Sequence, residues 1–153
     1  IKSFEGLEHR QFLVRTINGI SYINDSKATN AEATKQALKA YRNVFLIAGG
    51  RSKDGGLNGL ENHLTDVPHA FLYGECADEF DGFLKSRGVE TSVFKTMDEA
   101  VLEAHKKAQS MRGEPSGSPT VLLSPASASF DQFQNFEIRG DHFVDLANQL
   151  EEE

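Results

Sequence analysis

Cysteine is nearly absent from this chain of 153 residues, because Cys76 is the only one. A single cysteine forms no disulfide within the chain and no thiolate zinc site, and such a composition suits a reducing compartment. We therefore predict a cytoplasmic location. The sequence also lacks a Lys/Arg cluster and any long apolar segment. Because those features mark nucleic-acid tracks, membrane spans and signal peptides, we expect neither nucleic acid nor a membrane as a partner.

Motifs with well-defined chemistry are missing as well. The chain contains neither the phosphate loop G-x-x-x-x-G-K-[ST] nor the dinucleotide fingerprint G-x-G-x-x-G, so alone it is not expected to bind ATP as a P-loop enzyme does. No G-x-S-x-G elbow places a serine nucleophile. The five histidines lack the spacing of metal ligands, so we predict no metal site. Four of them are interpreted as surface or packing residues: His63, His69, His105 and His142.

The remaining composition fits one folded domain. Hydrophobic residues make up 39% of the chain and charged residues 25%, and the formal net charge of −7 is spread along it. No shift in composition marks a boundary, so residues 1–153 are predicted to form a single domain. Because the chain opens with Ile1 and not with Met, we interpret it as part of a longer protein.

Strand patterns recur along the chain. Residues 12–24 hold two β-rich runs on either side of Asn18-Gly19, a pair typical of a tight hairpin because both turn positions favour positive φ. Short apolar runs typical of buried strands follow at residues 44–48, 69–73, 91–95 and 120–124. Residues 112–119 are predicted to form a loop.

Helical patterns separate these strands. Helices are predicted from residue 29 to 41, around Phe80, Phe83 and Leu84, from Thr96 toward Met111, through Phe143 to Leu150, and, shorter, at Leu57, Leu60 and Leu64. Capping boxes are predicted for Thr29 with Glu32, Thr96 with Glu99, and Ser129 with Gln132. The alternation predicts an α/β fold: a Rossmann-like, three-layer domain with a mostly parallel, six-stranded sheet, to which the N-terminal hairpin adds an antiparallel edge.

Three polar loops follow predicted strands, at residues 24–30, 49–56 and 124–136. Because ligands bind at the carboxyl ends of the strands in such sheets, we expect the three loops to meet in one site. In the first loop, Asp25 suits ribose hydroxyls and Lys27 a phosphate, next to a helix N-terminus that favours anions. The alternative is that Thr29 only caps its helix while Asp25 and Lys27 form a solvated pair.

The other two loops carry groups that bind anions. In GGRSKDGG, paired glycines expose backbone N–H groups, and Lys53 offers a point charge for a carboxylate or phosphate. The alternative is a plain turn with an incidental lysine. In the third loop, Pro125 ends the strand and Ser129 places a hydroxyl near a predicted helix N-terminus. An ordinary serine cap, followed by the core residues Phe130, Phe133 and Phe136, is the alternative.

These segments together resemble a known family. NDSKATN at residues 24–30, LIAGGRSKDG at 46–55 and LLSPASASFDQFQNFEIRGDHF at 122–143 resemble the C-terminal domain of the Mur ligases, and most closely of the members that add D-glutamate. The similarity covers nearly the whole chain from His9 onward. One departure is Ser127, which stands where the family commonly has a cysteine in SPACAS, and which we interpret as structural.

The resemblance implies an ATP-dependent acid–amino-acid ligase of peptidoglycan synthesis. Its substrates are UDP-N-acetylmuramoyl-L-alanine, D-glutamate and ATP, and Mg²⁺ assists the transfer. In that family the UDP-sugar site lies in an N-terminal domain, and the P-loop and metal ligands lie in a central one. The present chain would then be the amino-acid-binding lid, which is not expected to be active alone. Two alternatives stay open: a non-catalytic nucleotide-binding α/β module, and a sister ligase with another amino acid.

The resemblance also implies roles for individual residues. Arg10 and Asp25 would bind ATP, with His9 close by at the hinge. Lys27 would be catalytic, facing the reacting phosphate. For D-glutamate, Thr29 and Lys53 would hold one carboxylate, and Ser129, with backbone amides near Phe130 and Phe136, would hold the other.

Overall fold

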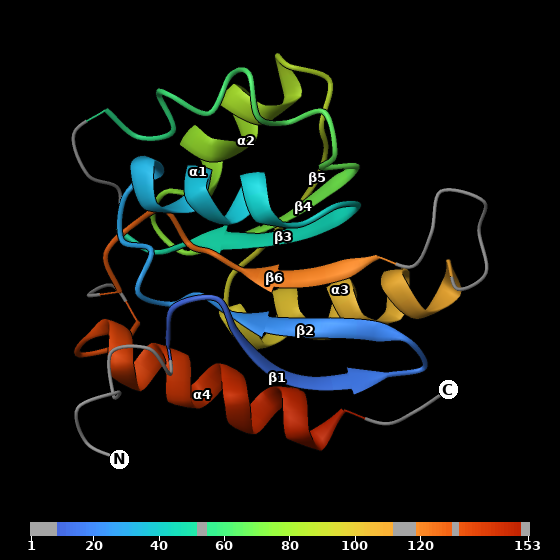
Figure 1. Cartoon of the computed structure of the whole chain (residues 1–153). Helices are drawn as coiled ribbons and strands as arrows, with labels where there is room; N and C mark the ends of the chain where they lie inside the picture. The colour runs from blue at the N-terminus through green and yellow to red at the C-terminus, as the bar shows by residue number, and fades with distance from the viewer. Residues whose placement is uncertain (1–8, 52–54, 112–118, 130–131, 151–153) are drawn as a thin grey trace.

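The computed structural model describes residues 9–51, 55–111, 119–129 and 132–150. One six-stranded sheet runs through it in the order β1-β2-β6-β3-β4-β5 (Figure 1). Its strands are β1 Phe12–Ile17, β2 Ile20–Asn24, β3 Val44–Gly49, β4 His69–Tyr73, β5 Glu90–Phe94 and β6 Thr120–Leu123. β1 pairs antiparallel with β2, and every other pairing is parallel. The predicted fold class is therefore confirmed.

Four helices in the described residues cover the two faces of the sheet. They are α1 Ala31–Ala40, α2 Ala77–Lys85, α3 Met97–Ser110 and α4 Phe136–Gln149. α1 and α2 lie on one face, and α3 and α4 lie on the other (Figure 1). Because successive side chains of a strand point to opposite faces, β3 feeds both cores, with Leu46 in the α1/α2 core and Phe45 in the α3/α4 core.

The opening hairpin forms as predicted. Asn18 and Gly19 have φ angles of 53° and 84°, the left-handed pair that a two-residue hairpin turn needs. Because β1 and β2 are antiparallel, residue 12 at the start of β1 pairs with Asn24 at the carboxyl end of β2. The hairpin thus places residues 9–11 next to the first polar loop.

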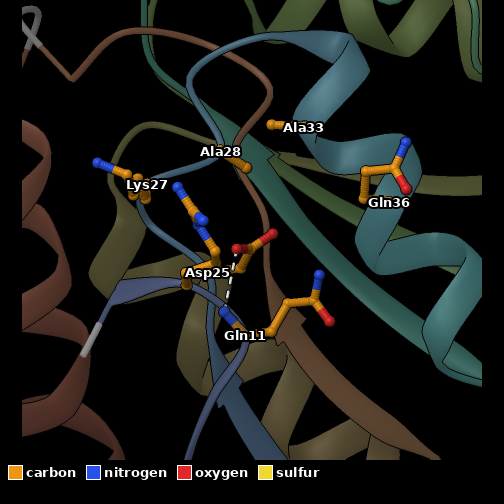
Figure 2. Close-up of a pocket in the computed structure, with 7 residues that line it drawn as sticks. Gln11, Asp25, Lys27, Ala28, Ala33 and Gln36 are labelled. Carbon is orange, nitrogen blue, oxygen red and sulfur yellow. Dashed lines mark hydrogen bonds between the residues drawn. The ribbon is translucent and has the colours of Figure 1, made fainter. Parts of the chain in front are cut away.

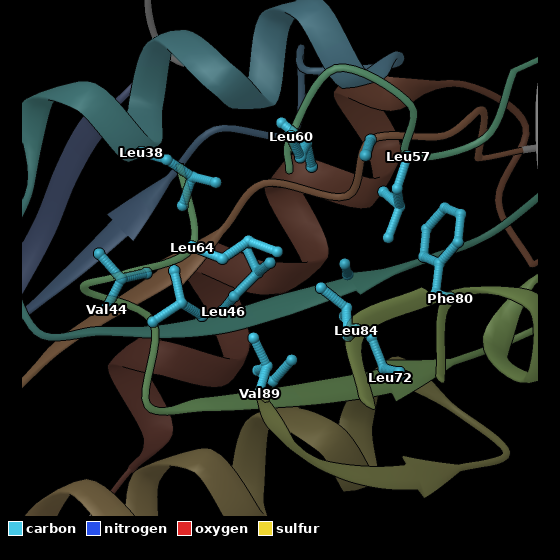
Figure 3. Close-up of a cluster of buried hydrophobic side chains, with 14 of the residues drawn as sticks. Leu38, Val44, Leu46, Leu57, Leu60, Leu64, Leu72, Phe80, Leu84 and Val89 are labelled. Carbon is cyan, nitrogen blue, oxygen red and sulfur yellow. The ribbon is translucent and has the colours of Figure 1, made fainter. Parts of the chain in front are cut away.

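The predicted helix at Leu57, Leu60 and Leu64 is wrong. The three leucines are buried in the α1/α2 core, but successive turns carry them there (Figure 3). Backbone bonds from Leu60 N to Leu57 O and from Val67 N to Leu64 O span three residues, not the four of an α-helix. Apolar spacing of three to four residues fits both geometries, so the pattern found the core residues and not their backbone.

Two of the three predicted capping boxes are wrong. The box of Thr96 with Glu99 is present at the start of α3. At α1, Asn30 is the N-cap in place of Thr29, and at α4 the N-cap is Asn135, six residues after Ser129. Asparagine is at least as good an N-cap as serine or threonine, so a neighbouring Asn outcompetes the predicted residue.

Smaller differences concern element ends. β5 lies one residue earlier than predicted, and β6 ends at Leu123, before Ser124-Pro125. The predicted loop at 112–119 falls, up to residue 118, outside the described residues.

Candidate functional site

The three polar loops meet at the carboxyl edge of the sheet, as predicted. The N–H of Ala126 donates to the Ala28 carbonyl at 3.0 Å, which joins the third loop to the first. Arg51 and Ala128 exchange two backbone hydrogen bonds of 2.8 and 3.0 Å, which join the second loop to the third. The start of the second loop, up to Arg51, is therefore held by the third loop.

Asp25 is the first polar side chain beyond β2, and it is buried. Its Oδ2 accepts from the Ser124 hydroxyl at 2.7 Å, and its Oδ1 accepts from the Gln11 N–H at 3.1 Å. Burial raises the pKa of Asp25 to about 6, although both hydrogen bonds and the nearby Arg10 charge lower it. The alternative of a solvated Asp25–Lys27 pair is wrong, since Asp25 as a residue is only 3% exposed.

A pocket of about 250 Å³ opens beside this carboxylate (Figure 2). Its lining residues are Arg10, Gln11, Asp25, Lys27, Ala28, Ala33 and Gln36. Figure 2 shows Asp25 between the backbone of Gln11 and the side chains of α1. The pocket thus combines two cations, a carboxylate, amides and small apolar side chains, a set that can contact the phosphate, ribose and base of a nucleotide.

Lys27 is held by the start of α4. Its Nζ lies 4.7 Å from the centroid of the Phe136 ring, a cation–π distance. The Lys27 N–H donates to the His9 carbonyl at 2.9 Å, and the His9 ring stands edge-on to Phe136. His9 itself is buried, with Nδ1 3.0 Å from Asn24 Nδ2. Lys27 and His9 are therefore packed against the start of α4.

Of the residues predicted for D-glutamate, the described ones, Thr29, Ser129 and Phe136, do not line this pocket. Thr29 is half-buried in the turn before α1, and Ser129 is 2% exposed in the loop after β6. The Ser129 carbonyl accepts from the Phe133 N–H at 2.8 Å, so the backbone folds back after it. Lys53 and Phe130 lie outside the described residues.

Ser127 is fully buried, and its hydroxyl donates to the Gly49 carbonyl. The hydroxyl thus ties the third loop to the end of β3. This placement agrees with the structural interpretation of Ser127.

Arg139 is a buried residue that the sequence reasoning missed. It is 0% exposed, and its guanidinium donates to Ser26 Oγ, Ser26 O and Ser127 O at 2.9, 2.8 and 3.0 Å. A signal existed, because Arg139 precedes the predicted core residue Phe143 by four positions and so shares its helix face. A cation on an apolar helix face calls for buried acceptors.

Three of the histidines predicted to be surface or packing residues have described contacts of these two kinds. His69 stacks on Phe71 at 4.2 Å, and His105 Nδ1 lies 2.6 Å from the Tyr22 hydroxyl. His142 contacts Asp98 at 2.7 Å on the surface.

Among the described residues, no group of three or more His, Cys, Asp or Glu side chains could hold a metal ion. Across the same part of the chain, no helix is long and apolar enough to cross a membrane.

Comparison with known proteins finds close sequence relatives, although no family model matches the chain. The chain is 49% identical to the UDP-N-acetylmuramoylalanine–D-glutamate ligase of Rhodospirillum rubrum, over 97% of the chain and 30% of that protein. It is 46% identical to the ligase of the same name from Rhodopseudomonas palustris, over 99% of the chain and 32% of that protein. The chain therefore spans about a third of the length of these relatives.

Solved structures share the fold. A domain assigned to a UDP-N-acetylmuramate:L-alanyl-gamma-D-glutamyl-meso-diaminopimelate ligase of Haemophilus ducreyi aligns with a TM-score of 0.55 at 15% identity, over 90% of this chain and 99% of that one. UDP-N-acetylmuramate-alanine ligase from Thermotoga maritima also aligns with a TM-score of 0.55, at 13% identity, over 92% of this chain and 30% of that one. The chain is thus similar in sequence to about a third of the length of D-glutamate ligases, and it is similar in fold to domains of Mur ligases.

Proposed function

We propose that this chain is the C-terminal domain of a cytoplasmic ligase that joins D-glutamate to UDP-N-acetylmuramoyl-L-alanine in peptidoglycan synthesis, using ATP. The observation that carries the proposal is the pocket lined by Arg10, Asp25 and Lys27. The loop of Asp25 and Lys27 is hydrogen-bonded to the loop that contains Ser129. The identity of 49% to a D-glutamate ligase over 97% of the chain supports the choice of amino acid.

The pocket supports a shared active site. Its volume of about 250 Å³ falls below the roughly 300–1,000 Å³ usual for small-molecule sites. A nucleotide would therefore need a second wall, which we assign to a central ATP-binding domain of the parent protein. The UDP-sugar would occupy an N-terminal domain, and the present chain would close over both as a lid.

The reaction would proceed through an acyl phosphate. The L-alanine carboxylate attacks the γ-phosphorus of ATP and releases ADP. The amine of D-glutamate then attacks the acyl carbon, a base takes its proton, and the tetrahedral intermediate expels inorganic phosphate as the amide forms. Both steps bring anions together, so positive charge at the reacting phosphate lowers the barrier.

The described side chains suit the two steps of this reaction, phosphoryl transfer and amide formation. Lys27 would face the transferred phosphoryl group. The Phe136 ring, whose centroid lies 4.7 Å from Lys27 Nζ, would restrict the movement of the ammonium group. Asp25 would accept hydrogen bonds from ribose hydroxyls, with Arg10 and the nearby His9 on the nucleotide side. D-glutamate would bind between Thr29 with Lys53 and Ser129 with the backbone near Phe130 and Phe136.

Mg²⁺ would assist the phosphoryl transfer. The described residues do not fit a metal site, because they contain no cluster of three or more suitable ligands. We therefore assign the metal ligands to the central domain of the parent protein.

The proposal is tested by ADP release from the complete parent protein supplied with ATP, Mg²⁺ and UDP-N-acetylmuramoyl-L-alanine. D-glutamate, L-glutamate, L-lysine and diaminopimelate are compared as the amino acid. We expect release with D-glutamate alone. Release with another amino acid indicates a sister ligase, and nucleotide binding without any turnover indicates a non-catalytic nucleotide-binding module.

Replacing Ser129 by alanine in the parent protein is expected to raise the KM for D-glutamate about 10- to 100-fold. The reason is the loss of a hydrogen bond to a carboxylate, worth about 1.5–3 kcal/mol. The KM for ATP should stay within about twofold, because Ser129 does not line the pocket beside Asp25. Ser110→Ala, on the exposed end of α3, is the control. Equal losses for both substrates would show a misfolded loop and refute the assignment.

Lys53→Met is expected to weaken use of D-glutamate by about 1.5–3 kcal/mol in kcat/KM, the range for a lost charge-assisted contact. The matched control is Lys39→Met in the last turn of α1, which removes the same charge away from the three loops. Steady-state kinetics with D-glutamate as the varied substrate measures both. An unchanged KM for D-glutamate in Lys53→Met is incompatible with the proposed contact.

A further inference from the structure

Arg139 occupies a place that no solvent reaches. Its side chain is 0% exposed, and burying a guanidinium is costly unless its N–H groups find acceptors. Nε donates to Ser26 Oγ at 2.9 Å, Nη2 to the Ser26 carbonyl at 2.8 Å, and Nη1 to the Ser127 carbonyl at 3.0 Å. One planar group on α4 therefore holds the loop after β2 and the loop after β6 at once.

The loop after β3 lies against the same guanidinium. A Cβ added to Gly50 would lie 3.3 Å from Arg139 Nη1 and 2.8 Å from Ser127 Oγ. The Ser26 hydroxyl, which accepts from Arg139, donates in turn to the Phe136 carbonyl at 2.6 Å. All three loops and the start of α4 thus pack around one cation.

The contacts of Arg139 fall next to the residues proposed to bind the reactants. Ser26 directly precedes Lys27, and Ser127 lies two positions before Ser129. By contrast, the Asp25 side chain accepts hydrogen bonds from the Ser124 hydroxyl and from the Gln11 N–H. The guanidinium therefore joins the loop of Lys27 to the loop of Ser129, whereas the Asp25 carboxylate has hydrogen-bond partners of its own.

We infer that Arg139 is a positioning residue, which fixes the distance between Lys27 and Ser129 and hence between the acyl phosphate and the attacking amine. The inference rests on the proposed function for its catalytic consequence. Its structural core, that one guanidinium sets the geometry of both loops, stands on the contacts alone. Lysine cannot replace it, because an ammonium lacks the fixed planar fork that reaches two loops.

Arg139→Lys in the complete parent protein tests the catalytic part. We expect kcat/KM for D-glutamate to fall at least tenfold, with the KM for ATP within twofold. The matched control is Arg15→Lys, since Arg15 also donates to carbonyls of α4, but at its far end, with Ala147 at 3.1 Å. That variant should change neither constant more than twofold. Equal changes in both constants for Arg139→Lys, or no change, would overturn the inference.

Amide hydrogen exchange on the 153-residue chain tests the structural part without any activity. We expect the N–H groups of Ala28, Ala126 and Ala128, which are all bonded within the loops, to exchange at least tenfold faster in Arg139→Lys. The N–H groups of Leu46 and Leu122 in the central strands should change no more than in Arg15→Lys. Uniform loss of protection would show general destabilisation and refute a positioning role.

Two further results separate the possible failures. If the unaltered parent protein does not turn over D-glutamate, the proposed function is wrong, and the exchange result still decides whether Arg139 fixes the loops. If Arg139→Lys does not fold, Ser26→Ala removes one acceptor of the guanidinium while keeping the charge. We then expect at least threefold faster exchange at Ala126 and Ala128, and unchanged exchange there would refute the inference.

Discussion

Replacing Gly50 by alanine is expected to lower the free energy of unfolding by about 3–5 kcal/mol, from backbone strain and overpacking together. Gly50 has a φ of +127°, a conformation that residues with a Cβ rarely adopt. A Cβ at this position would lie 2.3 Å from the Ala128 carbonyl oxygen. The neighbour is backbone and cannot turn aside, so the loops after β3 and β6 would have to separate.

Urea unfolding of the chain measures this cost. Gly82→Ala is the control and should change the free energy of unfolding in the opposite direction. Gly82 lies inside α2, and nothing lies within 4 Å of an added Cβ. Alanine there should stabilise the chain by about 0.5–1 kcal/mol through helix propensity. A Gly50→Ala variant within 1 kcal/mol of the unaltered chain would show that the loops can part cheaply, contrary to the packing described.

The requirement at Gly50 shows what a sequence pattern can and cannot predict. That the paired glycines form a turn after a strand is a local property, and it was predicted. That the turn must lack a side chain depends on Ala128, which is far away in the sequence and forms the neighbouring wall. No local pattern records that contact.

Hydrophobic periodicity was sufficient for the strands, because burial on both faces leaves a continuous apolar run such as VFLIA in β3. Periodicity predicted a helix at Leu57, Leu60 and Leu64, and this was wrong. Successive turns there bury leucines at the same spacing as a helix would. The predicted N-cap residues Thr29 and Ser129 were wrong, because a nearby asparagine is at least as good an N-cap.

For the candidate site, too, some features could be predicted from the sequence and others could not. Position after consecutive parallel strands predicted that Asp25, Gly50 and Ser129 lie on one rim, because topology alone brings those loops together. The burial of Asp25 and the particular loops that Arg139 contacts could not be predicted. Each depends on which groups from distant segments close over it, Ser124 and Gln11 in one case and Ser26 and Ser127 in the other.

The second large effect concerns Asp25, whose burial makes the stability of the chain depend on pH. Its pKa in the folded chain is about 6, raised from an ordinary value of 3.8 chiefly by desolvation. Below pH 4 the carboxyl is protonated whether the chain is folded or unfolded, and folding loses nothing. Above pH 6 it is ionised in both states, and the folded state bears a penalty of about 3 kcal/mol. Stability from this group is therefore lost as pH rises from about 4 to 6.

Asp25→Asn is expected to remove that loss. Asparagine keeps an acceptor for the Gln11 N–H, and its amide can donate to the Ser124 hydroxyl. That hydroxyl can then turn its own proton to Thr34 Oγ1, which lies 3.0 Å away. The substitution thus neutralises the buried charge and keeps hydrogen bonds to Gln11 and Ser124.

Unfolding free energies of both chains, measured in denaturant between pH 4 and 7.5, give the result as a difference. The stability of Asp25→Asn relative to the unaltered chain should rise by about 3 kcal/mol across the interval and level off above pH 6. Asp66→Asn is the control, since that carboxylate pairs with Arg42 on the surface and should contribute under about 1 kcal/mol at any pH. A difference that does not change with pH would mean that Asp25 is solvated in the folded chain. A rise would show a carboxylate that weakens the fold at neutral pH, where the proposed ligand of the pocket, with its ribose hydroxyls, would supply the missing hydrogen bonds.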